Sequence, residues 1–501
     1  MTESRREFLK KSGGCALGMV TLATQMQHMG LMSALAQKVQ DDPASPEGGT
    51  DYKALVLIFW SGGCDGNNIV APNHSDATLS NYSVYAGLRS NLAIPQASLL
   101  PITVPRMGGL TYGLHPNFGP VTGGINNGIH ELWAQQKLAI VTNCGTLVRP
   151  TTKAQLSQPL HPKPYQLYSH SDQVSQYQTS ISNTQAFTGW GGRVSDQLTA
   201  GSNPTALIPM VTSIAGAQLF TSGQSTLPLA INDSNTSLAN VLNPAGFGTP
   251  PPTGSNLARL NAFNSLRTQD LSSNYIAAAS HVTDLAMQAN SALAVSQDTT
   301  VTFPNTSIGR QLRQVARLIK KRLDLNVNRQ IFYVQMGGFD THTGQINGQN
   351  NLFSQYSQAV RSFYDELTAQ SIQNNVTTFT LSDFGRTMNP AGAGTADVGS
   401  DHAWGNHMLV LGGSVLGGNF YGMNTATNGT PFPNLVLSGL DDADTTTASN
   451  PARGRWIPTT SVDQYANTLA RWFGLPQDTA TLEEVFPNLD NFTSSNLGFL
   501  P

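Results

Sequence analysis

Residues 376–413 read VTTFTLSDFGRTMNPAGAGTADVGSDHAWGNHMLVLGG, and this stretch decides the fold that we expect. An apolar run ends just before Asp383. A loop rich in Gly and Ala then carries Asp401, His402 and His407 to a second apolar run. An α/β protein presents its chemistry in this way, because side chains at strand ends are held by a rigid sheet and face an open crevice. The stretch therefore predicts a functional edge of a sheet.

Two further stretches share this design. Residues 55–60 form an apolar run that leads into SGGCDGNN, which carries Asp65. Residues 331–336 lead into GGFDTH, which carries Asp340 and His342. Three strand ends that each carry an Asp predict one shared site.

The fold class follows from the way helical and strand patterns alternate. A helix capped by Ser307 and an amphipathic helix around 353–367 separate the later apolar runs, and a further helix is expected at 125–135. This alternation favours parallel strands with crossover helices. We expect one α/β domain at 52–501, in which a mostly parallel central sheet is sandwiched by helices. Residues 200–300, rich in Ser, Thr, Asn, Gly and Pro, are expected to form a polar insertion or cap.

The N-terminal residues indicate export. Residues 4–10, SRREFLK, form a twin-arginine pattern, and Ala-Leu-Ala at 34–36 has the form of a cleavage site. We interpret 1–36 as a twin-arginine signal peptide and 37–51 as a flexible lead-in. The alternative is a basic amphipathic helix at the start of a cytosolic protein. Export by the twin-arginine translocase predicts a periplasmic, extracellular or cell-surface protein.

Composition and cysteine content set further bounds. Charged residues make up 11% of the chain and the net charge is -3, so no basic excess predicts a nucleic-acid partner. Beyond the signal peptide, no stretch is apolar enough for a stable membrane span. Cys64 and Cys144 remain in the mature chain. An oxidising compartment permits a disulfide between them, but two buried free thiols are the interpretation that we favour.

The candidate metal ligands are carboxylates and imidazoles. Such groups suit zinc, manganese or magnesium, with calcium as a further option if more oxygen atoms contribute. Converging carboxylates repel one another, so either a cation lies among them or they do not converge. Two divalent ions are one known arrangement for displacement at phosphorus. The candidates are Asp65, Asp340, His342, Asp383, Asp401, His402 and His407.

Each candidate also has a purely structural interpretation. Asp65, Asp340 and His342 could form turns at strand ends. Asp383 could pair with Arg386, and His407 could be a core histidine with satisfied hydrogen bonds. These alternatives stay open from the sequence alone.

The chain resembles the DUF1501 family of exported bacterial proteins, which belongs to the alkaline phosphatase-like, sulfatase-related superfamily. The resemblance rests on motifs over most of residues 53–490: LVLIFWSGGCDGNN, LHPNFGP, SHSDQ, TGWGGR, GGFDTH, SDFGRT, GSDHAWGNH, LGGSVLGGNFYG and SVDQYANTLARWFG. By chain order, the resemblance implies that Asp65 is the ligand from the first strand and that Ser169 falls in the nucleophile region. The superfamily often has His directly after the Asp at the later strand end. Phe384 stands there, and Asp401-His402 could take over that role.

The resemblance implies a function. We expect an exported, metal-dependent hydrolase of phosphate or sulfate esters, with a small anionic ester as its substrate. Ser169 would attack, a cation held by Asp65 and Asp383 would activate it, and Arg386 would orient the oxyanion. Ser171 is a second candidate nucleophile, and either serine could instead be a helix cap. The alternative function is a non-catalytic cell-surface or assembly protein on the same fold.

Overall fold

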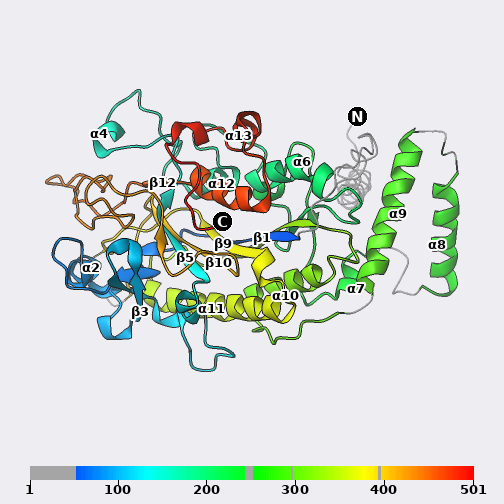
Figure 1. Cartoon of the computed structure of the whole chain (residues 1–501), viewed down its shortest axis with the longest axis horizontal. Helices are drawn as coiled ribbons and strands as arrows, with labels where there is room; N and C mark the ends of the chain where they lie inside the picture. The colour runs from blue at the N-terminus through cyan, green and yellow to red at the C-terminus, as the bar shows by residue number, and fades with distance from the viewer. Residues whose placement is uncertain (1–51, 243–251, 270, 272–273, 295–296, 393–396) are drawn as a thin grey trace, which may run out of the picture.

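The computed structural model describes most of the chain beyond its first 51 residues (Figure 1). Both the expected signal peptide and the lead-in lie outside the described residues and stay predictions. Within the described part of the chain, no helix combines the length and apolarity needed to cross a membrane. The described residues are 52–242, 252–269, 271, 274–294, 297–392 and 397–501.

A nine-stranded sheet forms the centre of the fold, and eight of its strands lie in the order β11-β5-β10-β9-β1-β8-β6-β7, with β12 beside β5. All pairs in it are parallel except those that β10 makes with β5 and β9. The prediction of a mostly parallel sheet is confirmed. The strands are β1 (Lys53–Trp60), β5 (Leu138–Gly145), β6 (Val211–Ser213), β7 (Leu229–Ala230), β8 (Arg329–Met336), β9 (Val376–Ser382), β10 (Asn406–Gly412), β11 (Phe420–Tyr421) and β12 (Thr460–Ser461).

Helices cover both faces of this sheet. Side chains of β1 alternate between the two faces, as the period of a strand requires. Val56 and Ile58 pack in one apolar core with α10 (Ser307–Lys320) and α11 (Gln345–Ala369). Leu55 and Leu57 pack in another with α6 (Trp190–Ser202) and α12 (Val462–Phe473). The expected sandwich of helices around a sheet is therefore present (Figure 1).

The remaining elements surround this core. A small antiparallel sheet has the order β2-β4-β3, and α8 and α9 form a hairpin at one side of the molecule (Figure 1). These elements are β2 (Val70–Pro72), β3 (Leu100–Val104), β4 (Leu110–Leu114), α2 (Tyr82–Arg89), α3 (Glu131–Ala134), α4 (Lys153–Leu156), α5 (His170–Thr179), α7 (Leu238–Val241), α8 (Gly254–Arg267), α9 (Asn274–Ala294) and α13 (Thr479–Val485).

Several local expectations differ from the structure. Only Glu131–Ala134 is helical within the expected helix at 125–135, because Gly128 turns the chain at φ +72°. The cap of α10 is Thr306, whose side chain accepts a hydrogen bond from the Gly309 N–H, and Ser307 is the first helical residue. Part of 200–300 is no cap, since β6 and β7 extend the central sheet. Cys64 and Cys144 are buried free thiols, as favoured from the sequence.

The edge that carries the candidate residues is formed by β9, β1 and β8. Trp60 at the end of β1 is in register with Met336 of β8 and with Ser382 of β9. The three following loops therefore leave the sheet side by side. The carboxyl ends of parallel strands are where open α/β sheets bind ligands.

Candidate metal centre

The loops at this edge pack against one another very closely. Gly62, just after β1, has φ +117°, and a Cβ atom there would lie 2.4 Å from the backbone nitrogen of Asp340. Only glycine fits such an approach. The Gly62 N–H also donates a 3.0 Å hydrogen bond to Oδ1 of Asp383, so the three loops form one unit.

Four side chains converge on a single point above this unit. Ligand atoms of His170, Asp340 and His402 all lie within 4.8 Å of one another. His342 joins them, because its Nε2 lies 3.2 Å from Oδ1 of Asp340 and 3.0 Å from Nε2 of His402. Oδ1 of Asp340 lies 3.7 Å from Nε2 of His170 and 3.8 Å from Nε2 of His402. We call these four residues the Asp340 cluster.

Every histidine of the Asp340 cluster directs its Nδ1 atom at an oxygen that accepts hydrogen bonds. At neutral pH a carbonyl or carboxylate oxygen only accepts, which assigns a proton to Nδ1, and in the neutral form of such a ring Nε2 carries the lone pair that binds a metal. Ring partners of this kind are how proteins orient histidine ligands of metals. The pairs are His170 with Oδ2 of Asp383 at 2.7 Å, His402 with the Tyr168 carbonyl at 2.8 Å, and His342 with Oδ1 of Asp401 at 3.2 Å.

The centre of the Asp340 cluster therefore holds acceptors almost exclusively. Nε2 of His170 is buried and has no hydrogen-bond partner in the described part of the chain. Three imidazole lone pairs and a carboxylate oxygen repel one another, and a cation would relieve this repulsion. Ligand atoms of a tetrahedral zinc ion with bonds of about 2.0–2.1 Å lie about 3.3 Å apart. The separations in the cluster bracket that value, so these residues fit a divalent ion.

Burial and charge keep these groups in the forms that a metal needs. Burial lowers the pKa of His402, which favours the neutral imidazole. Partial burial works to raise the pKa of Asp340, but the hydrogen bond and charge of Arg386 outweigh it, and the pKa is lowered. Burial raises the pKa of Asp383 despite its contact with His170.

Phe384 forms the floor under the cluster. Its ring centroid lies 4.8 Å from that of His170 and 4.5 Å from that of His402. The ring also fills the space beside Gly63, where a Cβ atom would lie 2.3 Å from it. Phe384 therefore supports two imidazoles at the place where the resembled superfamily often has a histidine.

Asp65 lies outside the Asp340 cluster. Its carboxylate pairs with the buried guanidinium of Arg89 and accepts from the side chain of Gln345. Its other oxygen accepts from the backbone and the side chain of Asn67. Both oxygens are thus already used within the described structure, and the Asp65 side chain is 1% exposed.

His407 lies in the core. It is 3% exposed, its Nδ1 accepts from the backbone N–H of Asn143 at 3.2 Å, and its ring stacks on Phe432. Burial lowers its pKa to about 3. These contacts match the structural interpretation that the sequence left open.

Arg386 is fully buried and holds the loops at this edge together through hydrogen bonds. Its guanidinium donates to the carbonyl oxygens of Gly62, Gly63 and Ser400, and one nitrogen lies 2.6 Å from Oδ1 of Asp340. It therefore reaches the cluster only through Asp340. Asp401 likewise orients His342 with one oxygen and pairs with Arg453 through the other.

Ser169 precedes α5 directly, next to His170. Its hydroxyl donates to Oδ2 of Asp172 at 2.5 Å and lies 3.3 Å from the hydroxyl of Ser171. Ser169 is flanked by Tyr168 and His170, which both take part in the cluster's contacts. His170 lies in the SHSDQ motif but is not among the residues nominated from the sequence, where Ser169 and Ser171 were the candidates. A histidine at the first position of a helix, beside those serines, was the available signal.

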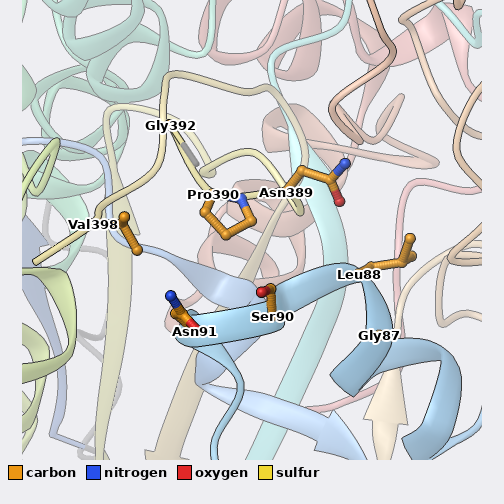
Figure 2. A pocket seen from close by; sticks show the side chains of 8 residues that line it. All are labelled: Gly87, Leu88, Ser90, Asn91, Asn389, Pro390, Gly392 and Val398. Carbon is orange, nitrogen blue, oxygen red and sulfur yellow. The ribbon is translucent and has the colours of Figure 1, made fainter. Parts of the chain in front are cut away.

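A pocket of about 370 Å³ lies near this edge but is separate from the cluster (Figure 2). Ser90 and Asn91 line it from below in this view, and Asn389, Pro390 and Val398 line it from the opposite side. None of the four cluster residues is among its lining residues. The candidate metal centre is therefore an open constellation at the sheet edge and not this pocket.

Comparisons with known proteins agree with the sequence resemblance. A family model described as "Protein of unknown function (DUF1501)" matches residues 52–437. The comparison with curated proteins finds no match. One similar solved structure is the PsFucS1 sulfatase from Pseudoalteromonas sp., with 11% identity, a match over 79% of this chain and 68% of that chain, and a TM-score of 0.26. Another is a protein in the alkaline phosphatase superfamily from Vibrio parahaemolyticus, with 12% identity, a match over 77% of this chain and 69% of that chain, and a TM-score of 0.29. A third is the C-terminal periplasmic domain of EcEptC from Escherichia coli, in a complex with Zn, with 11% identity, a match over 74% of this chain and 77% of that chain, and a TM-score of 0.25. The structural likeness is remote.

Proposed function

Because the chain belongs to the DUF1501 family, whose function is unknown, we propose its function from its own site. We propose that it is a metal-dependent hydrolase of phosphate or sulfate esters that acts outside the cytoplasm. The observation that carries the proposal is the convergence of three Nε2 atoms on a carboxylate oxygen of Asp340. The twin-arginine pattern at 4–10 supports export.

The residues that would hold the ion are His170, Asp340 and His402, with His342 beside them. Zinc and manganese suit this mixture of nitrogen and oxygen ligands better than calcium does. A divalent ion there would supply Lewis acidity, which polarises an ester oxygen and stabilises the negative charge that develops during displacement. Asp383, Asp401 and the Tyr168 carbonyl would keep the three imidazoles in the ligating tautomer.

Ser169 is the nucleophile in this proposal, and Asp172 accepts its proton. The hydrogen bond between them already has the direction that this transfer requires. Oγ would form a bond to phosphorus or sulfur while the bond to the alcohol oxygen breaks, and the alcohol would leave with the proton that Asp172 took from Ser169. Water would then release the anion from Ser169. The N-terminus of α5, a ten-residue helix, favours negative charge at this place.

The test uses the full chain without its first 36 residues, loaded in turn with Zn²⁺, Mn²⁺ and Mg²⁺. We expect one tightly held ion per chain and hydrolysis of 4-nitrophenyl phosphate or 4-nitrophenyl sulfate. EDTA should abolish the activity and the metal should restore it. Asp340→Asn should lose both ion and activity, Ser169→Ala should lose activity alone, and Asp478→Asn, an exposed helix cap, should change neither. A protein that binds the ion yet cleaves neither ester contradicts the proposal.

A non-catalytic cell-surface or assembly protein is the second candidate function. The observation that favours it is that two buried arginines at this sheet edge are already engaged. Arg89 pairs with Asp65, and Arg386 donates mainly to carbonyl oxygens, so neither is free to bind an anionic substrate. Metal binding without ester cleavage would select this function.

A further inference from the structure

The three histidines of the Asp340 cluster are held with very different firmness. The His170 side chain is 35% exposed, and it bonds at 2.7 Å to Asp383, whose side chain is 2% exposed and is itself fixed by a backbone N–H. His402 bonds at 2.8 Å to a backbone carbonyl and is 24% exposed. The rings of both also pack on Phe384. These two ligands are rigid parts of the fold.

His342 is held far less firmly. Its side chain is 45% exposed, and its Nδ1 reaches Oδ1 of Asp401 only at 3.2 Å. Asp401 is itself 33% exposed and is shared with Arg453. The only ring near His342 among the described residues is that of His402. The imidazole of His342 can therefore move away by breaking only its hydrogen bond to Asp401 and its ring contact with His402.

Building on the metal site of the proposed function, we propose that His342 is a displaceable fourth ligand and that the position it leaves binds a tetrahedral oxyanion. A metal site with four protein ligands is closed, whereas a catalytic site needs an open position. Nε2 of His342 lies 3.2 Å from Oδ1 of Asp340 and 3.0 Å from Nε2 of His402, so it would take a ligand position next to these two atoms. With His342 present the site is closed, and with His342 displaced it is open on its solvent side.

The direction of entry follows from exposure. Asp340 is 51% exposed and His342 45%, while Asp383 behind the cluster is 2% exposed. An incoming oxyanion therefore approaches from the side of Asp340 and His342, and of these two Asp340 is held by Arg386, which leaves His342 as the group that can move aside. Asp401 stays in place after His342 leaves, because Arg453 holds it and is fixed in turn by the carbonyl oxygens of Asn389 and Pro390. His342 consequently has a fixed partner to which it can return.

The experiment uses Co²⁺ as a spectroscopic probe of the site and inorganic phosphate as the oxyanion. The full chain without its signal peptide is loaded with Co²⁺, and its visible spectrum is followed as phosphate is added. In wild type, phosphate has to displace His342, which lowers its apparent affinity by the fraction of open sites. We expect His342→Ala to keep one ion per chain, with an altered spectrum before phosphate, and to bind phosphate at least about tenfold more tightly.

Two further variants complete the design. His402→Ala removes a firmly held ligand and should lose the ion. His281→Ala changes an exposed histidine on α9 and should match wild type in every measurement. Loss of the ion from His342→Ala, to the same extent as from His402→Ala, would overturn the proposal by making His342 an essential ligand. An unchanged spectrum and unchanged phosphate affinity would overturn it by showing that His342 is no ligand.

The outcome is separable from that of the proposed function. If phosphate binds as expected and no ester is cleaved, the hydrolase proposal fails and the role of His342 stands. If esters are cleaved and His342→Ala behaves like wild type or like His402→Ala, the role of His342 fails and the hydrolase proposal stands. A wild-type chain that takes up no ion overturns both.

Discussion

Asp65 and Asp340 follow neighbouring parallel strands, and the sequence gives them the same setting of glycine and polar residues. The structure gives them opposite surroundings. Asp65 is 1% exposed and is matched by the guanidinium of Arg89. Asp340 is 51% exposed and meets three imidazole nitrogens, with Arg386 on its buried side. Both aspartates thus have an arginine beside them, and a strand-end aspartate becomes a candidate ligand only when its carboxylate also keeps a side that is open to a further partner.

The strongest test of this contrast removes the partner of Asp65. Arg89→Met leaves a carboxylate buried without its counter-charge and deprives two carbonyl oxygens, those of Thr387 and Met388, of their donor. We expect the free energy of unfolding of the metal-free protein to fall by about 3–5 kcal/mol. Urea denaturation measures it.

Asp340→Asn is the matched change in the other region. Because Asp340 is half-exposed and Arg386 keeps three carbonyl partners, we expect a loss below about 1 kcal/mol. Equal losses in Arg89→Met and Asp340→Asn would erase the distinction between a structural and a ligating aspartate.

The second test adds the ion. An ion that binds only the folded state raises the free energy of unfolding, by about 2.7 kcal/mol at a free concentration of 100 times Kd. We expect Zn²⁺ to stabilise wild type in this way and to stabilise Asp65→Asn by a similar increment, although that variant starts from a lower stability. Asp340→Asn should gain nothing. A gain that disappears in Asp65→Asn and persists in Asp340→Asn would reverse the assignment of the two regions.

The third test concerns Asp383, whose carboxylate holds Nδ1 of His170 on the buried side of the cluster. Asp383→Asn removes the negative charge that orients and polarises His170, and its single amide oxygen can accept from His170 Nδ1 or from the Gly62 N–H, but not from both. We expect Kd for Zn²⁺ to rise about 10–100-fold. Isothermal titration calorimetry measures it, with Asp478→Asn as the control. An unchanged Kd would mean that the Asp383–His170 contact is only a packing feature.

Sequence reasoning placed the scaffold well, since continuous apolar runs mark buried parallel strands. β1 and β8 each begin two residues before the apolar runs at 55–60 and 331–336 and end at the same residue, and β9 ends directly before Asp383, as expected. The capping box of Ser461 and Gln464 and the end of α12 at Gly474 likewise depend on local backbone chemistry.

The site was less accessible to sequence reasoning, because its outcome depends on partners that are distant along the chain. Arg89 comes from α2 and Gln345 from α11, and no local pattern links either of them to Asp65. His170 comes from α5 and meets Asp340 only through the fold. The sequence could thus nominate strand-end aspartates, while three-dimensional contacts decide which of these carboxylates can still accept a metal ion.

The last contrast is between two histidines five residues apart, His402 in the cluster and His407 at the start of β10 in the core. Burial lowers the pKa of His407 from its usual value near 6.5 to about 3, so the folded protein resists a proton that the unfolded chain accepts. The stabilising contribution is complete above pH 6.5 and is lost as the pH falls toward 3. Between pH 7.5 and pH 5.5 this histidine should account for about 1.4 kcal/mol of lost stability.

His407→Gln tests this, because glutamine keeps an acceptor for the Asn143 N–H and does not titrate. Over the same pH interval, the free energy of unfolding of His407→Gln, measured with urea, should fall by about 1.4 kcal/mol less than that of wild type. The control His281→Gln, at an exposed position, should follow wild type. The same decline in His407→Gln as in wild type would show that His407 can be protonated where it lies, and would remove the reason for separating it from the ligating histidines.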